Sequence, residues 1–163
     1  MGVGVLEKLD MMIAGLRSFS ETLWSQTVTV FYDNQDMVLD ENRRQLEEKK
    51  RPDGSDIMPY YGQVYAEYKG FVKPDLRDTG AFYESLTLEH DGESVWVTST
   101  DWKWLYPIPP TWLPHPDGDE SLHERYGNVL GVSKEFVSSM MVPLVLDAFI
   151  INLRYALRNG AIK

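Results

Sequence analysis

The sequence predicts an α+β fold in which helices precede and follow a small antiparallel sheet. Apolar residues recur at helical spacing near both ends of the chain, and a hairpin pattern occupies residues 86–99. The length of 163 residues is that of one ordinary domain. We therefore expect a single domain over 1–163, with a central hairpin packed against the terminal helices and a Pro/Trp-rich insertion at about 102–120.

The N-terminal part is predicted to be helical. A short amphipathic helix over residues 4–17 is indicated by four apolar residues at helical spacing, Leu6, Leu9, Ile13 and Leu16. Ser18 or Ser20 is suited to cap a second helix. Residues 27–32 leave two alternatives open, because their β-branched side chains favour a strand while both neighbouring segments favour a helix.

A further helix is predicted to begin at Asp33 or Asn34, with a solvated last turn at 47–51. One side of this helix carries Val38, Leu39, Asn42 and Leu46. Asp53 and Gly54 follow Pro52, and this combination predicts that the helix stops and the chain turns.

Two short helices are expected before the hairpin. The first covers about 62–69 and ends at Gly70, with three tyrosines on one face, Tyr61, Tyr65 and Tyr68. The second covers 80–86, where Thr79 caps the turn and Gly80 allows the chain to bend, with Phe82 and Leu86 facing inward.

The hairpin has the strongest local signal in the chain. Its two arms alternate apolar and polar residues, and Asp91-Gly92 lies between them. The residues on one face are Leu86, Leu88 and His90 on the first arm and Val95, Val97 and Ser99 on the second. Trp96 points to the opposite face, where another element or another subunit must cover it.

The insertion at 102–120 combines aromatic residues with five prolines, a density that forbids regular helix and central strand. Two readings have equal weight: a flap folded back on its own core, or an arm that reaches another subunit. With Trp96, the candidate interface residues are Trp102, Trp104, Tyr106 and Trp112.

The C-terminal helix is predicted from Ser133, its cap, to Asn159-Gly160, with a kink or restart at Pro143. A core-facing stripe is predicted from the positions of Leu146, Phe149, Ile150, Leu153 and Leu157. The most apolar stretch, 142–153, is short for a bilayer span and contains Asp147, so no membrane contact is expected.

The bulk properties disfavour several classes of protein. The net charge of −9 opposes binding to DNA, RNA or anionic lipid. The absence of cysteine excludes disulfides and thiolate metal sites. Charged residues among the first ten interrupt any signal peptide, so a cytoplasmic site of synthesis is expected.

No catalytic constellation emerges from the residues. Cysteine nucleophiles are excluded, and no Gly-x-Ser-x-Gly elbow or phosphate-binding glycine loop is present. A metal site is conceivable at His115, Asp117, Asp119 and His123, but their spacing matches no known ligand pattern. The tyrosines of 60–68 could stack bases, yet few cations accompany them. We expect no enzyme activity, no cofactor and no metal.

Four segments, in this order, carry a resemblance. They are Asp53-Gly54 with Met58-Pro59-Tyr60, then Tyr65 to Gly70, then Leu76 to Leu86 with Thr79-Gly80, then Asp91-Gly92 to Asp101. This series resembles the phage virion-morphogenesis and tail-completion proteins, which include head–tail connector and tail-terminator relatives. The insertion at 102–120 is longer and more aromatic than the corresponding link in that family.

The resemblance implies a ring-forming structural subunit of the virion neck or tail, assembled in the host cytoplasm. Its implied partners are copies of itself and the portal, connector and tail proteins, and DNA passes through its channel without specific binding. Two alternatives remain: a binding module that presents the 102–120 loop to a partner, and a small metal-dependent hydrolase.

Overall fold

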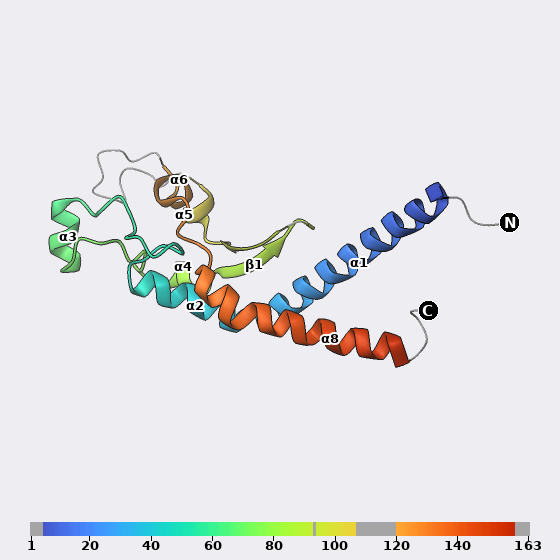
Figure 1. The fold of residues 1–163 in the computed structure, drawn as a ribbon. Helices are drawn as coiled ribbons and strands as arrows, with labels where there is room; N and C mark the ends of the chain where they lie inside the picture. The colour runs from blue at the N-terminus through green and yellow to red at the C-terminus, as the bar shows by residue number, and fades with distance from the viewer. Residues whose placement is uncertain (1–4, 93, 107–119, 159–163) are drawn as a thin grey trace.

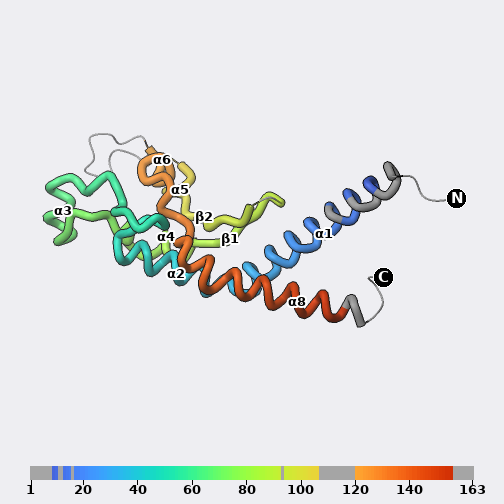
Figure 2. Tube along the Cα trace, viewed as in Figure 1, coloured from blue at the N-terminus to red at the C-terminus, as the bar shows by residue number. Residues whose placement is uncertain are grey.

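The fold combines a compact body with two long helical arms (Figure 1). The computed structural model describes residues 5–92, 94–106 and 120–158, and the side chains of 9–10, 13–15, 17–92, 94–106 and 120–155. The described part has helices around one two-stranded antiparallel sheet, which confirms the predicted α+β class. The trace in Figure 2 shows the arms α1 and α8 extending from the same side of the body.

Helix α1, Val5–Asp33, is one unbroken helix of 29 residues, so the predicted break near Ser18 or Ser20 is wrong. Residues 27–32 are helical, which settles the open choice between strand and helix. Threonine hydroxyls along the helix donate to the carbonyl four residues earlier: Thr22 to Ser18 at 2.8 Å and Thr27 to Leu23 at 2.9 Å. These bonds satisfy the threonine hydroxyls within the helix. The threonines therefore fit a helical backbone despite the preference of β-branched residues for strands.

Helix α2, Gln35–Glu47, follows directly after Asn34, as predicted. Asn34 makes no capping bond, because its side-chain amide donates back to the Val30 carbonyl at 2.8 Å. The predicted buried side is confirmed, since Val38, Leu39, Asn42 and Leu46 are all buried. The segment 48–51 is a turn and not the last turn of the helix, because Lys49 adopts a positive φ of 60°.

Helix α3, Gln63–Lys69, ends at Gly70, whose φ of 78° lies in the left-handed region. Helix α4, Ala81–Glu84, is shorter than the predicted 80–86 because Leu86 already belongs to the first strand. Phe82 and Leu86 are buried, as expected.

Strands β1, Leu86–His90, and β2, Val95–Ser99, form the predicted hairpin. The register pairs Leu86 with Ser99, Leu88 with Val97 and His90 with Val95, which places the predicted residues on one face. Leu88 and Val97 are buried, while the far end of the hairpin is exposed. The hairpin contacts the body mainly through β1 and α2.

Two short helices flank the segment that the structure leaves undescribed. Helix α5, Trp102–Leu105, occupies the first residues of the insertion, where the prediction had no regular helix. Its start is capped by Asp101, whose carboxylate accepts from the Lys103 amide at 2.8 Å. Helix α6, Leu122–Tyr126, begins with a complete capping box between Ser121 and Glu124.

Helices α7, Lys134–Phe136, and α8, Val142–Arg158, are joined without a break by a π-helical turn, η1, Val137–Met141. Ser133 caps the start, as predicted, by accepting from the Phe136 amide at 3.1 Å. Pro143 does not stop the helix. The wider π turn directly before it accommodates the missing amide hydrogen. The predicted end at Asn159-Gly160 lies outside the described residues.

The hydrophobic core sits where α2, the hairpin, α5, α6 and η1 meet. The most completely buried apolar side chains in the described part are Leu46, Ile57, Met141, Val38 and Val129. The core therefore ends near the start of α8, and most of that helix projects beyond it (Figure 1).

Candidate interaction surfaces

The aromatic residues predicted as an interface separate into two groups. Trp96 is 38% exposed on β2, and Tyr106 is 62% exposed after α5. Trp102, at the start of α5, is 40% exposed. Trp104 is buried, with its ring 5.5 Å from Phe82. Trp104 therefore serves the core of this chain, and Trp112 lies outside the described residues.

Each predicted motif residue shapes a turn. Asp53 accepts from the amide and hydroxyl of Ser55 at 2.9 and 2.6 Å, and these bonds lower the pKa of Asp53. Gly54 follows with a φ of 82°. The Asp53-Gly54 pair thus builds the chain reversal after α2.

The other two pairs work in the same way. Thr79 accepts from the Ala81 amide at 3.3 Å, and Gly80 has a φ of 92° at the start of α4. Asp91 accepts from the Ser94 amide at 2.9 Å in the hairpin turn, where Gly92 has a φ of 95°. Positive φ at these glycines is unfavourable for residues with a Cβ atom, which explains their place in the pattern.

The tyrosine cluster is held by hydrogen bonds inside the chain. The Tyr61 hydroxyl donates to the Asp75 carboxylate at 3.0 Å, and the Tyr83 hydroxyl donates to the Asp75 carbonyl at 2.6 Å. Burial raises the pKa of both phenols, and the Asp75 charge adds to this effect. Tyr65 stacks edge-on against Tyr61 at 4.8 Å. This arrangement fits a packing role for the cluster better than base stacking.

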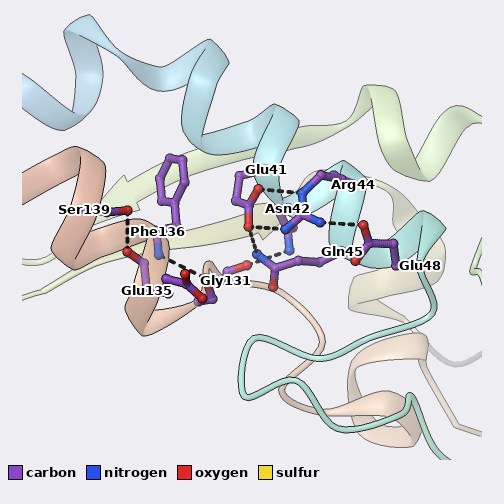
Figure 3. A network of polar contacts seen from close by, with 10 residues as sticks. Glu41, Asn42, Arg44, Gln45, Glu48, Gly131, Glu135, Phe136 and Ser139 are labelled. Carbon is purple, nitrogen blue, oxygen red and sulfur yellow. Dashed lines mark hydrogen bonds and ion pairs between the residues drawn. The ribbon is translucent and has the colours of Figure 1, made fainter.

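A second polar network ties α2 to the segment after α6 (Figure 3). The Asn42 amide donates to the carbonyl oxygens of Gly131 at 2.7 Å and Val129 at 3.4 Å. Beside it, Arg44 bridges Glu41 and Glu48, and its hydrogen bonds to these carboxylates raise the pKa of Arg44. The buried residue Asn42 has a structural role. Its side-chain amide supplies the hydrogen-bond donor for loop carbonyl oxygens that have no backbone partner.

The metal site that the sequence made conceivable is only partly within the described residues. Within those residues, no group of three or more His, Asp or Glu side chains is placed to hold a metal ion. His115, Asp117 and Asp119 of the conceivable metal site lie outside the described residues. His123, the fourth, is exposed and packs edge-on against Trp104 at 5.0 Å.

Several large apolar side chains are exposed on the arms, including the α8 stripe that the sequence predicted to face the core. Leu146, Ile150 and Leu153 of α8 are 52%, 40% and 37% exposed. The predicted core-facing stripe of α8 is therefore wrong for the isolated chain. Of the four stripe members whose side chains are described, Phe149 alone is half-buried, with its ring 5.4 Å from Phe19 of α1, and the side chain of Leu157 lies outside the described residues. The body is too short to cover the helix, so its apolar side faces solvent.

Helix α1 shows the same feature, because Leu9, Ile13 and Phe19 are about half exposed, at 48%, 47% and 50%. Where the two arms approach each other near the body, they enclose an apolar groove of about 310 Å³. The groove is lined by Leu23, Thr27, Phe31, Val137, Met141, Val142, Val145 and Leu146. Toward the chain ends the arms diverge, as Figure 1 shows.

The arm α8 has one further property. The continuous helix Lys134–Tyr155, 22 residues long, has the length and composition of a membrane span. The expectation that this region is too short rested on 142–153 alone and is corrected by the longer helix. Asp147 lies within it, and a charge at that depth in a bilayer is costly.

Comparisons with known proteins add no identity: no family model, no curated protein and no solved structure matches this chain.

Proposed function

We propose that this chain is a non-catalytic structural subunit of a bacteriophage virion. In this proposal, copies assemble into a ring at the head-to-tail connector or tail terminator, joining head to tail around the DNA channel. The observation that carries the proposal is the pair of arms with uncovered apolar sides. Apolar side chains exposed along two helices are typical of a surface that another protein or a membrane covers, and the proposal assigns that role to neighbouring subunits.

The body supports the same function. The four segments that resemble tail-completion proteins fold into consecutive turns, short helices and the hairpin of one body. The hairpin has two strands, so within the described residues each strand has an outer edge without a ladder partner. A neighbouring subunit that pairs with such an edge removes a site of aggregation.

The charge of the chain suits the proposed place. A net charge of −9 repels the DNA backbone, so DNA could slide through a channel of such subunits without sticking. The expected neighbours are the portal, connector and tail proteins of the virion.

A second candidate function is a binding module that presents the 102–120 loop. The observation in its favour is that Trp102 and Tyr106 are both exposed where the loop begins. Deleting residues 107–119 tests whether this segment binds another partner or contacts a neighbouring subunit. The deletion leaves ring formation intact if the loop serves another partner, and it disrupts the ring if the loop is an intersubunit arm.

The direct test measures assembly and location. Light scattering after size-exclusion chromatography and electron microscopy of the full chain should reveal closed rings, and the chain should co-purify with virions. A variant with Leu146→Glu and Ile150→Glu should stay folded but lose assembly, because it places charges on the uncovered stripe. Absence from purified particles, combined with a monomer at every concentration, would contradict the proposal.

A further inference from the structure

The two arms carry the same nine-residue pattern. Residues 9–17 read Leu-Asp-Met-Met-Ile-Ala-Gly-Leu-Arg, and residues 146–154 read Leu-Asp-Ala-Phe-Ile-Ile-Asn-Leu-Arg. Leu, Asp, Ile, Leu and Arg recur at the same places in both. The first pattern lies in the outer half of α1 and the second in α8.

The spacing of the pattern matches a helix that packs against another helix. Its Leu-Ile-Leu positions are separated by four and then three residues, which is the d-a-d spacing of a coiled-coil seam. In the structure, the described members of both seams are uncovered. They are Leu9, Ile13, Leu146, Ile150 and Leu153, with exposed fractions between 37% and 52%.

The charged positions are complementary when two such helices run antiparallel. Asp10 and Arg17 each follow a seam leucine by one residue, and Asp147 and Arg154 do the same on α8. All four therefore lie on the same rotational flank of their seam, the e position. In an antiparallel pair, equal flanks face each other. Asp10 then meets the arginine of the partner helix, and Arg17 meets its aspartate.

These charges are available for a partner. All four side chains are exposed. Among the side chains that the structure describes, none of the four belongs to an ion pair. The apolar seam thus has a charged border of matched spacing on each arm.

The two patterns do not pair within one chain. Within one chain the arms meet through the Phe19–Phe149 ring contact and through the groove near the body, which Leu146 lines. Ile150 and Leu153 remain exposed outside these contacts. Beyond these contacts the arms diverge toward their ends (Figure 1). The partner of each pattern must therefore come from outside the chain.

We propose that α1 of one copy of this chain packs antiparallel against α8 of the next copy, pattern against pattern. This choice of pairing rests on the proposed ring. A ring needs two different patches on each subunit, with each patch used once around the closed circle. The α1–α8 contact uses both patches once and leaves neither uncovered. A second copy also fits better than a bilayer, because Asp147 would have to enter the membrane within the helix Lys134–Tyr155.

Engineered cysteines in the full chain test this pairing, since the natural sequence has no cysteine. Two single variants, Ile13→Cys and Ile150→Cys, are mixed and treated with a short bis-maleimide. The mixture should give a covalent dimer that contains one copy of each variant, and each variant alone should give far less. The double variant Ile13→Cys/Ile150→Cys should give a ladder of covalent oligomers.

Matched controls lie one residue further along each helix. Ala14→Cys and Ile151→Cys are at exposed positions that point away from the seam, so their mixture should not crosslink. A charge exchange gives a second measurement. Asp147→Arg should weaken self-association about tenfold, and adding Arg17→Asp in the same chain should restore it.

Distinct outcomes overturn distinct claims. Rings without the mixed crosslink, or crosslinks formed only by a single variant with itself, overturn the α1–α8 pairing and leave the proposed function standing. A mixed crosslink in a chain that is absent from virions overturns the proposed function and leaves the pairing standing. A chain that stays monomeric, or that floats with phosphatidylcholine vesicles through its Ile150 face, overturns the pairing.

Discussion

The body and the arms of this protein are both rich in apolar residues, yet they use them differently. In the body, Leu46 and Ile57 are fully buried by segments distant in the sequence. In the arms, leucines and isoleucines at equally regular helical spacing remain about half exposed. Helical periodicity alone therefore does not distinguish a residue that stabilises its own chain from one that docks another chain. The length of the helix relative to the body decides this.

The largest expected effect compares one leucine from each region. Leu46→Ala should lower the free energy of unfolding by about 3 kcal/mol, because it leaves a cavity in a closed core. Leu146→Ala should change it by about 0.5 kcal/mol or less in the monomer, because its side chain is already 52% exposed. Urea denaturation at a concentration where the chain is monomeric measures both values.

In an assembly assay the order of the two variants should reverse. At a temperature at which both are folded, Leu146→Ala should reduce assembly more than Leu46→Ala. Equal losses of stability for the two variants would contradict the division between body and arms.

A smaller effect is expected at Asn42, which joins α2 to the segment that leads into the C-terminal arm. Asn42→Ala removes the donor for the Gly131 and Val129 carbonyl oxygens and should cost about 2 kcal/mol of stability. The exposed Arg44 on the same helix provides the control, since Arg44→Ala should cost about 0.5 kcal/mol. Thermal unfolding followed by circular dichroism ranks the two. If Arg44→Ala lowers the stability more than Asn42→Ala does, the hydrogen bonds of the buried Asn42 amide are not what holds α2 to the segment at 129–131.

The smallest expected effect is a pH dependence confined to the body. Hydrogen bonds from Lys50 and Lys73, both at 2.6 Å, lower the pKa of Asp56 in the folded chain. A carboxyl group with a lowered pKa stabilises the fold above its unfolded pKa, and this contribution is lost as the pH falls below about 4.

Asp56→Asn should therefore lower the melting temperature slightly at pH 7, and the difference from wild type should shrink as the pH falls from 4 toward 2. A constant difference between wild type and Asp56→Asn across this range would contradict the role of the charge.

Local chemistry made several parts of the fold predictable from the sequence. Asp91-Gly92 between alternating residues specified the hairpin and the face that its residues share, and Ser133 specified the start of the C-terminal helix. Each of these signals acts over a few residues, through a turn geometry or a hydrogen bond to a nearby amide. The buried side of α2 was equally readable, because four of its positions share one face.

Other features depended on contacts that no local signal contains. The burial of Trp104 and the exposure of Tyr106 follow from what packs beside α5, not from the aromatic composition they share. Thr27 was ambiguous because its β-branched side chain suits a strand, and only the continuous helix with its internal hydroxyl bonds resolved it. The candidate site on the arms was missed for a related reason. Its apolar stripe on α8 was recognised, but its role was not.

The sequence by itself determined the α+β class, the hairpin with its alternating faces, and the helical stripes, because turn chemistry and side-chain periodicity act locally. Only the tertiary structure decided which stripes are covered. The body encloses α2 on its inner face but reaches only the first turns of α8, so Ile150 stays exposed while Met141 is buried. Burial is a property of the whole arrangement, and the same periodic leucines and isoleucines become core or docking surface according to where the rest of the chain ends.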